Sequence, residues 1–152
     1  ANSKLTPLSK RLFEAKRQKK LTFEQIGQKM GRDEVWVAAV FYGQAKPTQE
    51  DGEKLSQILN VPQAHINEDM GPDFYPDRGG LISIPPTDPT LYRFYEILQV
   101  YGYPMKAVIH EKFGDGIMSA IDYSCHIEKE EDPKGDRVKI TMSGKFLPYK
   151  KF

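Results

Sequence analysis

The chain has 152 residues, and its 22 Lys and Arg against 21 Asp and Glu leave a formal net charge of +1, which gives no general attraction to nucleic acid or to a membrane. The single Cys125 excludes an internal disulfide, and no cysteine pattern of a metal site is present. Because neither a run of about 18 apolar residues nor the apolar segment of a signal peptide occurs, we expect a soluble, cytoplasmic protein in a reducing compartment, with no membrane or nucleic-acid partner.

Residues 1–70 carry the start and stop signals of a bundle of short helices. Thr22 and Gln25 have the spacing of a capping box, and Gly31 is placed to end the helix that they begin. The other expected helices run from Thr6-Pro7 to the basic run 16–20, over about Asp33–Tyr42, and around Leu55–Leu59 with Pro62 as a stop.

Two of these helices, joined by a turn at Gly31, resemble the helix-turn-helix of lambda-repressor-like DNA-binding domains. A helix that reads DNA offers donors such as Arg, Gln or Asn at its N-terminal end. The run 32–36 instead reads Arg-Asp-Glu-Val-Trp, and its two carboxylates would repel phosphates. We therefore interpret this helix-turn-helix as structural, with a DNA reader as the alternative.

Residues 71–87 form a Pro- and Gly-rich connector with little periodicity, in which 81–84 is the only candidate strand. It separates the helical domain, residues 1–70, from a second domain, residues 88–152. The chain as a whole is predicted to be of the α+β class.

The second domain is predicted to contain two helices and a β-hairpin. The first helix begins at Asp88-Pro89 and stops at Gly102, and its apolar stripe is expected to face a core. Pro104 begins the second helix and Gly114 ends it. Alternating residues predict strands over 121–127 and 138–142, joined by a turn at 132–136. Because a lone hairpin under two helices buries little apolar surface, we expect homo-oligomerisation to complete the core.

Arg93 and Glu96 lie three residues apart on the first of these helices, where their side chains meet. The ordinary interpretation of such a pair is a surface ion pair worth about a few tenths of a kcal/mol. His110 is interpreted as solvated or as a helix cap, and Cys125 as a small buried hydrophobe.

The order Y-R-F-Y-E-I-L-Q, then Y-G-Y-P-M-K-A, then F-G-D-G-I-M-S-A-I-D resembles the cyanase family over residues 88–152, and more loosely in the helical part. This resemblance implies a cyanate hydratase, a carbon-nitrogen lyase that acts on cyanate and bicarbonate. It places the catalytic residues at Arg93, Glu96 and Ser119, and it implies no metal and no organic cofactor. It also implies a homodecamer of five dimers with active sites at subunit interfaces, whose N-terminal domain is not known to read DNA.

The chemistry of these residues fits two anionic substrates. A fixed guanidinium at Arg93 offsets the repulsion between the anions, and N–H groups between Gly114 and Ser119 can form an anion-holding concavity. Glu96 either orients Arg93 or donates a proton. Two other functions stay open: a DNA-binding regulator with a ligand-sensing C-terminal domain, and a non-catalytic oligomeric scaffold.

Overall fold

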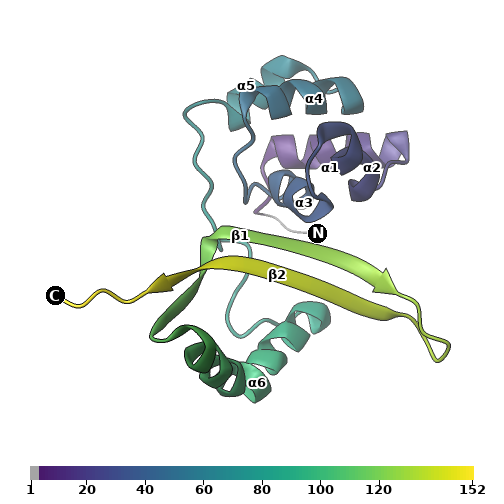
Figure 1. Ribbon diagram of the computed structural model, residues 1–152. Coiled ribbons are helices and arrows are strands. Elements are labelled where there is room, and N and C mark those ends of the chain that lie inside the picture. Colours follow the sequence, from purple (N-terminus) through teal and green to yellow (C-terminus); the bar gives the residue numbers. More distant parts are fainter. Residues whose placement is uncertain (1–3) are drawn as a thin grey trace. The chain divides into compact units, whose positions relative to one another are not determined.

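The computed structural model describes residues 4–152, which hold six helices and a two-stranded antiparallel sheet (Figure 1). The predicted α+β class is confirmed. The chain divides into two compact units, residues 1–81 and 82–152. The finer boundaries of the sequence analysis, with a separate connector over 71–87, remain a prediction.

The first unit is a bundle of five short helices. The predicted capping box at Thr22 and Gln25 is present, and Gly31 ends that helix with a φ of 73°. The fifth helix was missed because Pro62 was interpreted only as a stop, whereas it occupies the N-cap position of a helix that has no side-chain cap. The helices are α1 (Pro7–Lys19), α2 (Phe23–Met30), α3 (Glu34–Phe41), α4 (Gln49–Leu59) and α5 (Gln63–Met70).

This bundle has a continuous hydrophobic core. Phe41 is fully buried, and the ring of Phe13 packs edge-on against it at a centroid distance of 5.3 Å. The buried hydrophobic residues are Leu8, Leu12, Ile26, Met30, Val37, Val40, Phe41, Ala45, Leu55, Leu59, Val61, Ile66 and Met70.

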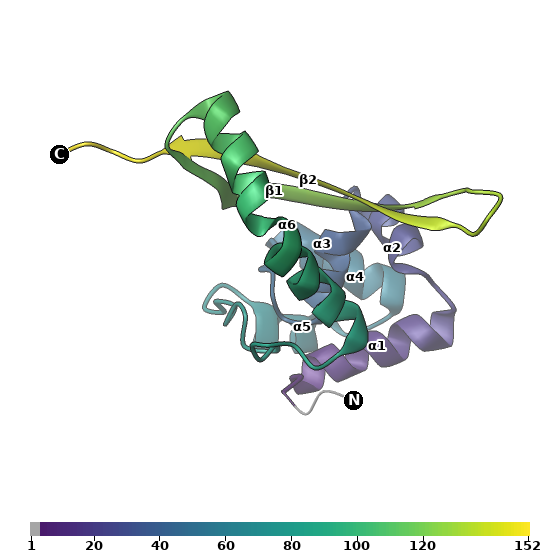
Figure 2. The ribbon, with the colours of Figure 1, turned by 90° about the horizontal axis from the view of Figure 1, so that it is seen from below.

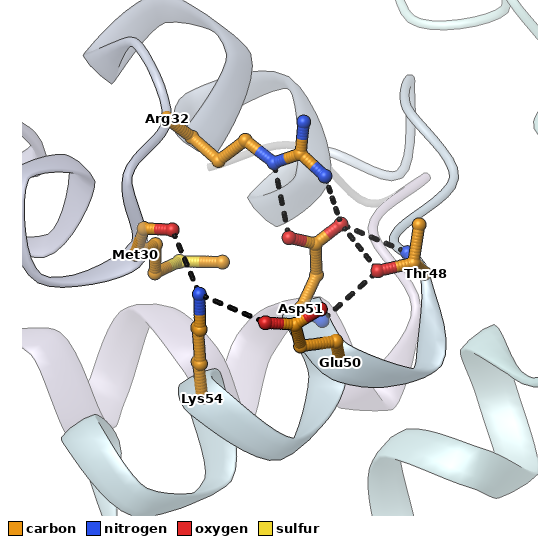
Figure 3. Close-up of polar contacts among 6 residues, drawn as sticks. All are labelled: Met30, Arg32, Thr48, Glu50, Asp51 and Lys54. Atoms are coloured by element: carbon orange, nitrogen blue, oxygen red, sulfur yellow. Dashed lines mark hydrogen bonds and ion pairs between the residues drawn. The ribbon is translucent and has the colours of Figure 1, made fainter.

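A buried carboxylate joins the turn between α2 and α3 to the start of α4 (Figure 3). The Asp51 carboxylate accepts bonds from Arg32 Nε and Nη2 at 3.0 and 3.1 Å, and from the Thr48 N–H and hydroxyl, each at 2.9 Å. Burial alone would raise the pKa of Asp51, but the hydrogen bonds from Arg32 and Thr48 outweigh it and lower that pKa. Arg32 and Asp51 therefore fix the position of α3 through charged hydrogen bonds.

Asp51→Asn is expected to lower the free energy of unfolding of the first unit by about 1–3 kcal/mol near pH 7, because Arg32 loses its charged partner. A carboxyl group whose pKa is lowered on folding stabilises the folded state at pH values above its unfolded pKa, about 3.9. That contribution to stability is lost as the pH falls through the folded pKa. The difference between wild type and variant should thus shrink below about pH 4. Denaturant unfolding of both proteins near pH 7 and below about pH 4 measures this difference in the free energy of unfolding.

Glu50→Gln is the matched control, because Glu50 lies on the same turn but pairs with Lys54 at the surface. We expect it to change stability by less than about 0.5 kcal/mol. Equal stabilities for Asp51→Asn and Glu50→Gln would contradict the role given to Asp51.

The second unit contains one long helix, α6 (Pro89–Phe113), so the prediction of two helices was wrong. Gly102 does not adopt the left-handed φ of a helix-ending glycine, and Pro104 lies inside the helix. A proline within a helix removes one hydrogen bond and favours a kink, and it need not end the helix. Gly114, with a φ of 91°, provides the actual end. His110 caps this end, because its Nδ1 lies 2.9 Å from the Gly114 carbonyl oxygen.

A long hairpin follows, formed by β1 (Gly116–Glu130) and β2 (Arg137–Pro148). Both strands extend further than the alternating pattern predicted. In both views the hairpin extends beyond α6 before it reaches the turn that joins β1 to β2 (Figures 1 and 2). There the Asp132 carboxylate accepts the Lys134 N–H, and Gly135 has a φ of 128°. Residues 81–84 form no strand, so that prediction was also wrong.

The second unit lacks a hydrophobic core of its own. All buried hydrophobic residues named above belong to the first unit, and among residues 82–152 only Pro86, Gly116 and Ser119 are buried. The apolar stripe of α6, expected to face a core, is exposed in the single chain at Phe94 and Leu98, because the hairpin does not cover it. No helix within residues 4–152 is long and apolar enough to cross a membrane.

Candidate active site

The start of α6 places Arg93 and Glu96 side by side. Asp88 caps the helix by accepting the N–H groups of Thr90 and Leu91, so the helical spacing is established before Arg93. Arg93 Nη1 donates to Glu96 Oε1 at 3.1 Å, as the three-residue spacing predicted. The two side chains are 63% and 49% exposed, so in the single chain they form a surface ion pair that contributes little stability.

Ser119 lies in a bulge of β1. The strand register shifts between Met118 and Tyr123, and the Ser119 side chain turns back on the bulged segment. Its Oγ accepts the N–H groups of Ile121 and Asp122 at 3.0 and 2.9 Å. The residue is only 4% exposed. Because both acceptor positions of the hydroxyl are occupied, its proton is left to be donated to another group.

Within the part of the chain that the structure describes, no hydrogen bond or ion pair joins Ser119 to Arg93 or Glu96. One backbone group of the glycine turn before Ser119 already has a hydrogen-bond partner, since the Asp115 carbonyl accepts the Tyr149 N–H at 3.1 Å. The alternating pattern in the sequence begins only at Ile121, so it indicates neither the bulge nor the two N–H groups that donate to the Ser119 hydroxyl. The assignment of the three residues to one site remains a prediction.

The other candidate residues have ordinary partners. His110 is a helix cap, as one of its two interpretations expected. Burial raises the pKa of the Tyr123 hydroxyl, and a hydrogen bond with the Cys125 thiol adds to the shift. No group of three or more His, Cys, Asp or Glu that could hold a metal occurs among residues 4–152. The expectation that no metal or cofactor is needed remains a prediction.

Comparison with known proteins covers nearly the whole chain. A curated cyanate hydratase of Coprinopsis cinerea is 54% identical over 97% of each chain. The chain belongs to the cyanate hydratase family. Another cyanate hydratase, from Synechocystis, is 55% identical over 100% of this chain and 99% of its own. A family model described as the cyanate lyase C-terminal domain matches residues 83–151.

A solved cyanase has the same fold. The crystal structure of cyanase from T. urticae matches this chain with a TM-score of 0.80 and 36% identity, covering 93% of this chain and 97% of that one. The resemblance stated from the sequence is thereby confirmed. Because the relatives above are named as cyanate hydratases, the alternative of a DNA-binding regulator gains no support.

Proposed function

We propose that the chain is a cyanate hydratase, a carbon-nitrogen lyase that decomposes cyanate with bicarbonate as co-substrate. The observation that carries this proposal is the identity of 54–55% with full-length relatives of that name. The paired Arg93 and Glu96 at the start of α6 supply a chemical basis for handling anions.

The proposed reaction begins when a bicarbonate oxygen forms a bond to the cyanate carbon, while the cyanate nitrogen takes up a proton. The bond between the bicarbonate carbon and the bridging oxygen then breaks and releases carbon dioxide, while the hydroxyl proton of the former bicarbonate passes to the nitrogen. The bridging oxygen stays in the carbamate, which takes up a proton and decomposes to ammonia and a second carbon dioxide. Since no electron transfer occurs, catalysis is mainly positioning and electrostatic stabilisation of like-charged reactants.

The three proposed catalytic residues divide this work. The Arg93 guanidinium holds an anion through two parallel N–H groups, and the Ser119 hydroxyl donates a hydrogen bond to it. Glu96 accepts from Arg93 directly, and on that contact we assign it the orienting role, with proton donation as the rival. No metal or organic cofactor enters this scheme.

Glu96→Gln separates the two roles of Glu96. An amide oxygen can still accept from Arg93, so an orienting residue should leave turnover within about tenfold of wild type with both limbs of the pH profile retained. Loss of about a hundredfold or more, together with one limb of the profile, would contradict the orienting role and indicate a proton donor. Initial rates of ammonia release across pH provide the measurement.

The chain is proposed to act as a homo-oligomer, most simply a decamer with sites between copies. Support comes from the second unit, whose apolar side chains are exposed along α6 and along both strands. A unit with so little buried apolar surface needs a partner surface to be stable. A second copy of the same unit also offers a way to bring Ser119 near Arg93 and Glu96.

Light scattering should therefore find a single large species, close to ten times the chain mass of 17.4 kDa, with few free monomers at micromolar concentration. The reason is that dissociation of the oligomer would expose the apolar side chains of α6 to water again. A stable, active species with the mass of one chain would contradict this prediction.

The first unit is proposed to have a structural helix-turn-helix and no nucleic-acid partner. Arg32, the cation nearest the start of α3, is held by the Asp51 carboxylate, and its guanidinium stacks over Trp36 at 4.8 Å. Asp33 caps α3 by accepting the Val35 N–H. The residues at this helix end thus serve the fold, and the two carboxylates there disfavour phosphate.

The proposed function is tested by ammonia release from cyanate with and without added bicarbonate in degassed buffer. We expect the rate to depend on bicarbonate and to saturate with it. Ammonia release at the same rate without bicarbonate would indicate simple hydrolysis, and no release under either condition would refute the proposal.

A further inference from the structure

Strand β2 approaches the bulge that carries Ser119 unusually closely, and it does so at Gly144. The register pairs Met118 with Phe146 and Tyr123 with Gly144, so residues 119–122 of β1 lie opposite Lys145 alone. A Cβ built on Gly144 would lie 2.4 Å from the Ser119 carbonyl oxygen and 2.6 Å from Met118 Cγ. Two backbones therefore meet at a place where β2 has no side chain.

Space alone requires glycine at this position. Gly144 is not among the glycines with a positive φ, so the left-handed backbone conformation is not what calls for glycine here. The obstacle is the Ser119 carbonyl oxygen, which belongs to the backbone and cannot rotate away as a side chain would. An added Cβ must move the Ser119 peptide or open the hairpin.

The geometry points to Gly144 as a positioning residue for Ser119, an inference that rests on the proposed function. The close approach of β2 holds the bulge in position. The bulge in turn points the N–H groups of Ile121 and Asp122 at the Ser119 Oγ. Because these two N–H groups occupy both acceptor positions of the Ser119 hydroxyl, the hydroxyl can interact with the proposed anion only as a hydrogen-bond donor. Moving the Ser119 peptide misdirects that donor, and a misplacement of about 1 Å can cost about a hundredfold in rate.

The test is a double-mutant cycle of Gly144→Ala and Ser119→Ala, read by kcat for ammonia release from cyanate and by light scattering. Gly144→Ala should lower kcat by about tenfold or more in the wild-type background and by less than about twofold in the Ser119→Ala background. Equal losses in both backgrounds would mean general damage to the hairpin and would overturn the inference. So would full activity of Gly144→Ala.

Gly102→Ala is the matched control, because a Cβ there meets no atom within 4 Å apart from its chain neighbours and the backbone of its own helix. It should retain kcat. If Gly144→Ala fails to assemble, Met118→Ala/Gly144→Ala replaces it in the cycle, with Met118→Ala as its reference. This variant removes the contact with the Met118 side chain and leaves only the overlap with the Ser119 carbonyl.

A second readout does not depend on turnover. Amide hydrogen exchange at Ile121 and Asp122 should become faster in Ser119→Ala and in Gly144→Ala, and stay unchanged in Gly102→Ala. Unchanged exchange in Gly144→Ala would overturn the positioning role even if the enzyme is active. If the wild-type chain releases no ammonia from cyanate, the proposed function fails, whereas the exchange experiment still decides whether Gly144 seats Ser119.

Discussion

Arg93→Leu is expected to lower the turnover of cyanate by at least about a hundredfold while the oligomer persists. The reason is that the proposed reaction brings two anions together, and Arg93 is the only cation among the three proposed catalytic residues. Its side chain is exposed in the single chain and contributes little stability there, so the loss should appear in activity and not in folding. Initial rates of ammonia release and light scattering on the same sample provide the measurement.

Lys106→Leu is the matched control for this substitution. Lys106 is a cation of the same helix and lies over the ring of Tyr103, much as Arg93 lies over the ring of Tyr92. Removing it should change turnover by less than about threefold, since it has no part in the proposed site. Comparable losses in both variants would mean that the general charge of α6 matters and that Arg93 has no special role.

Ser119→Ala is expected to have the next largest effect, a loss of about tenfold to a hundredfold, milder if backbone N–H groups share the anion. The substitution removes the hydroxyl that is proposed to donate a hydrogen bond to the anion. It also frees the N–H groups of Ile121 and Asp122. Steady-state kinetics should show the loss in kcat/KM, and wild-type kinetics in this variant would remove Ser119 from the site.

Mixing the two impaired variants tests whether each site contains residues from more than one copy of the chain. If Arg93 and Ser119 of one site come from different chains, subunit exchange between Arg93→Leu and Ser119→Ala oligomers should restore part of the ammonia release. The partial recovery arises because some mixed interfaces combine an intact Arg93 with an intact Ser119. No recovery after demonstrated exchange would contradict a shared site.

Local signals in the sequence were sufficient to predict much of the first unit. The capping box at Thr22 and the glycine at Gly31 are short-range features, and both act in the structure as expected. Gly102 and Pro104 do not divide α6 as predicted, because the neighbouring turns can continue a helix through residues that disfavour it. Helix α5 was missed because Pro62 ends one segment and begins the next.

The candidate site was less predictable, because much of its geometry is not local. The three-residue spacing correctly placed Arg93 beside Glu96. Nothing in the alternating pattern indicated that the register would shift around Ser119, where the backbone of Gly144 on the other strand lies close to the Ser119 carbonyl. The apolar stripe of α6 was evident, but a pattern does not tell which molecule covers it.

The ratio of carbon dioxide to ammonia distinguishes attack on cyanate by bicarbonate from attack by water. Attack by bicarbonate yields two molecules of carbon dioxide for each ammonia, one from the adduct and one from carbamate, whereas hydrolysis by water yields one. The measurement uses purified wild-type oligomer in a sealed cell, with ¹³C-labelled bicarbonate and unlabelled cyanate, and is corrected for spontaneous exchange with Arg93→Leu. We predict a ratio of two with half of the new carbon dioxide labelled; a ratio of one with unlabelled carbon dioxide would contradict attack by bicarbonate.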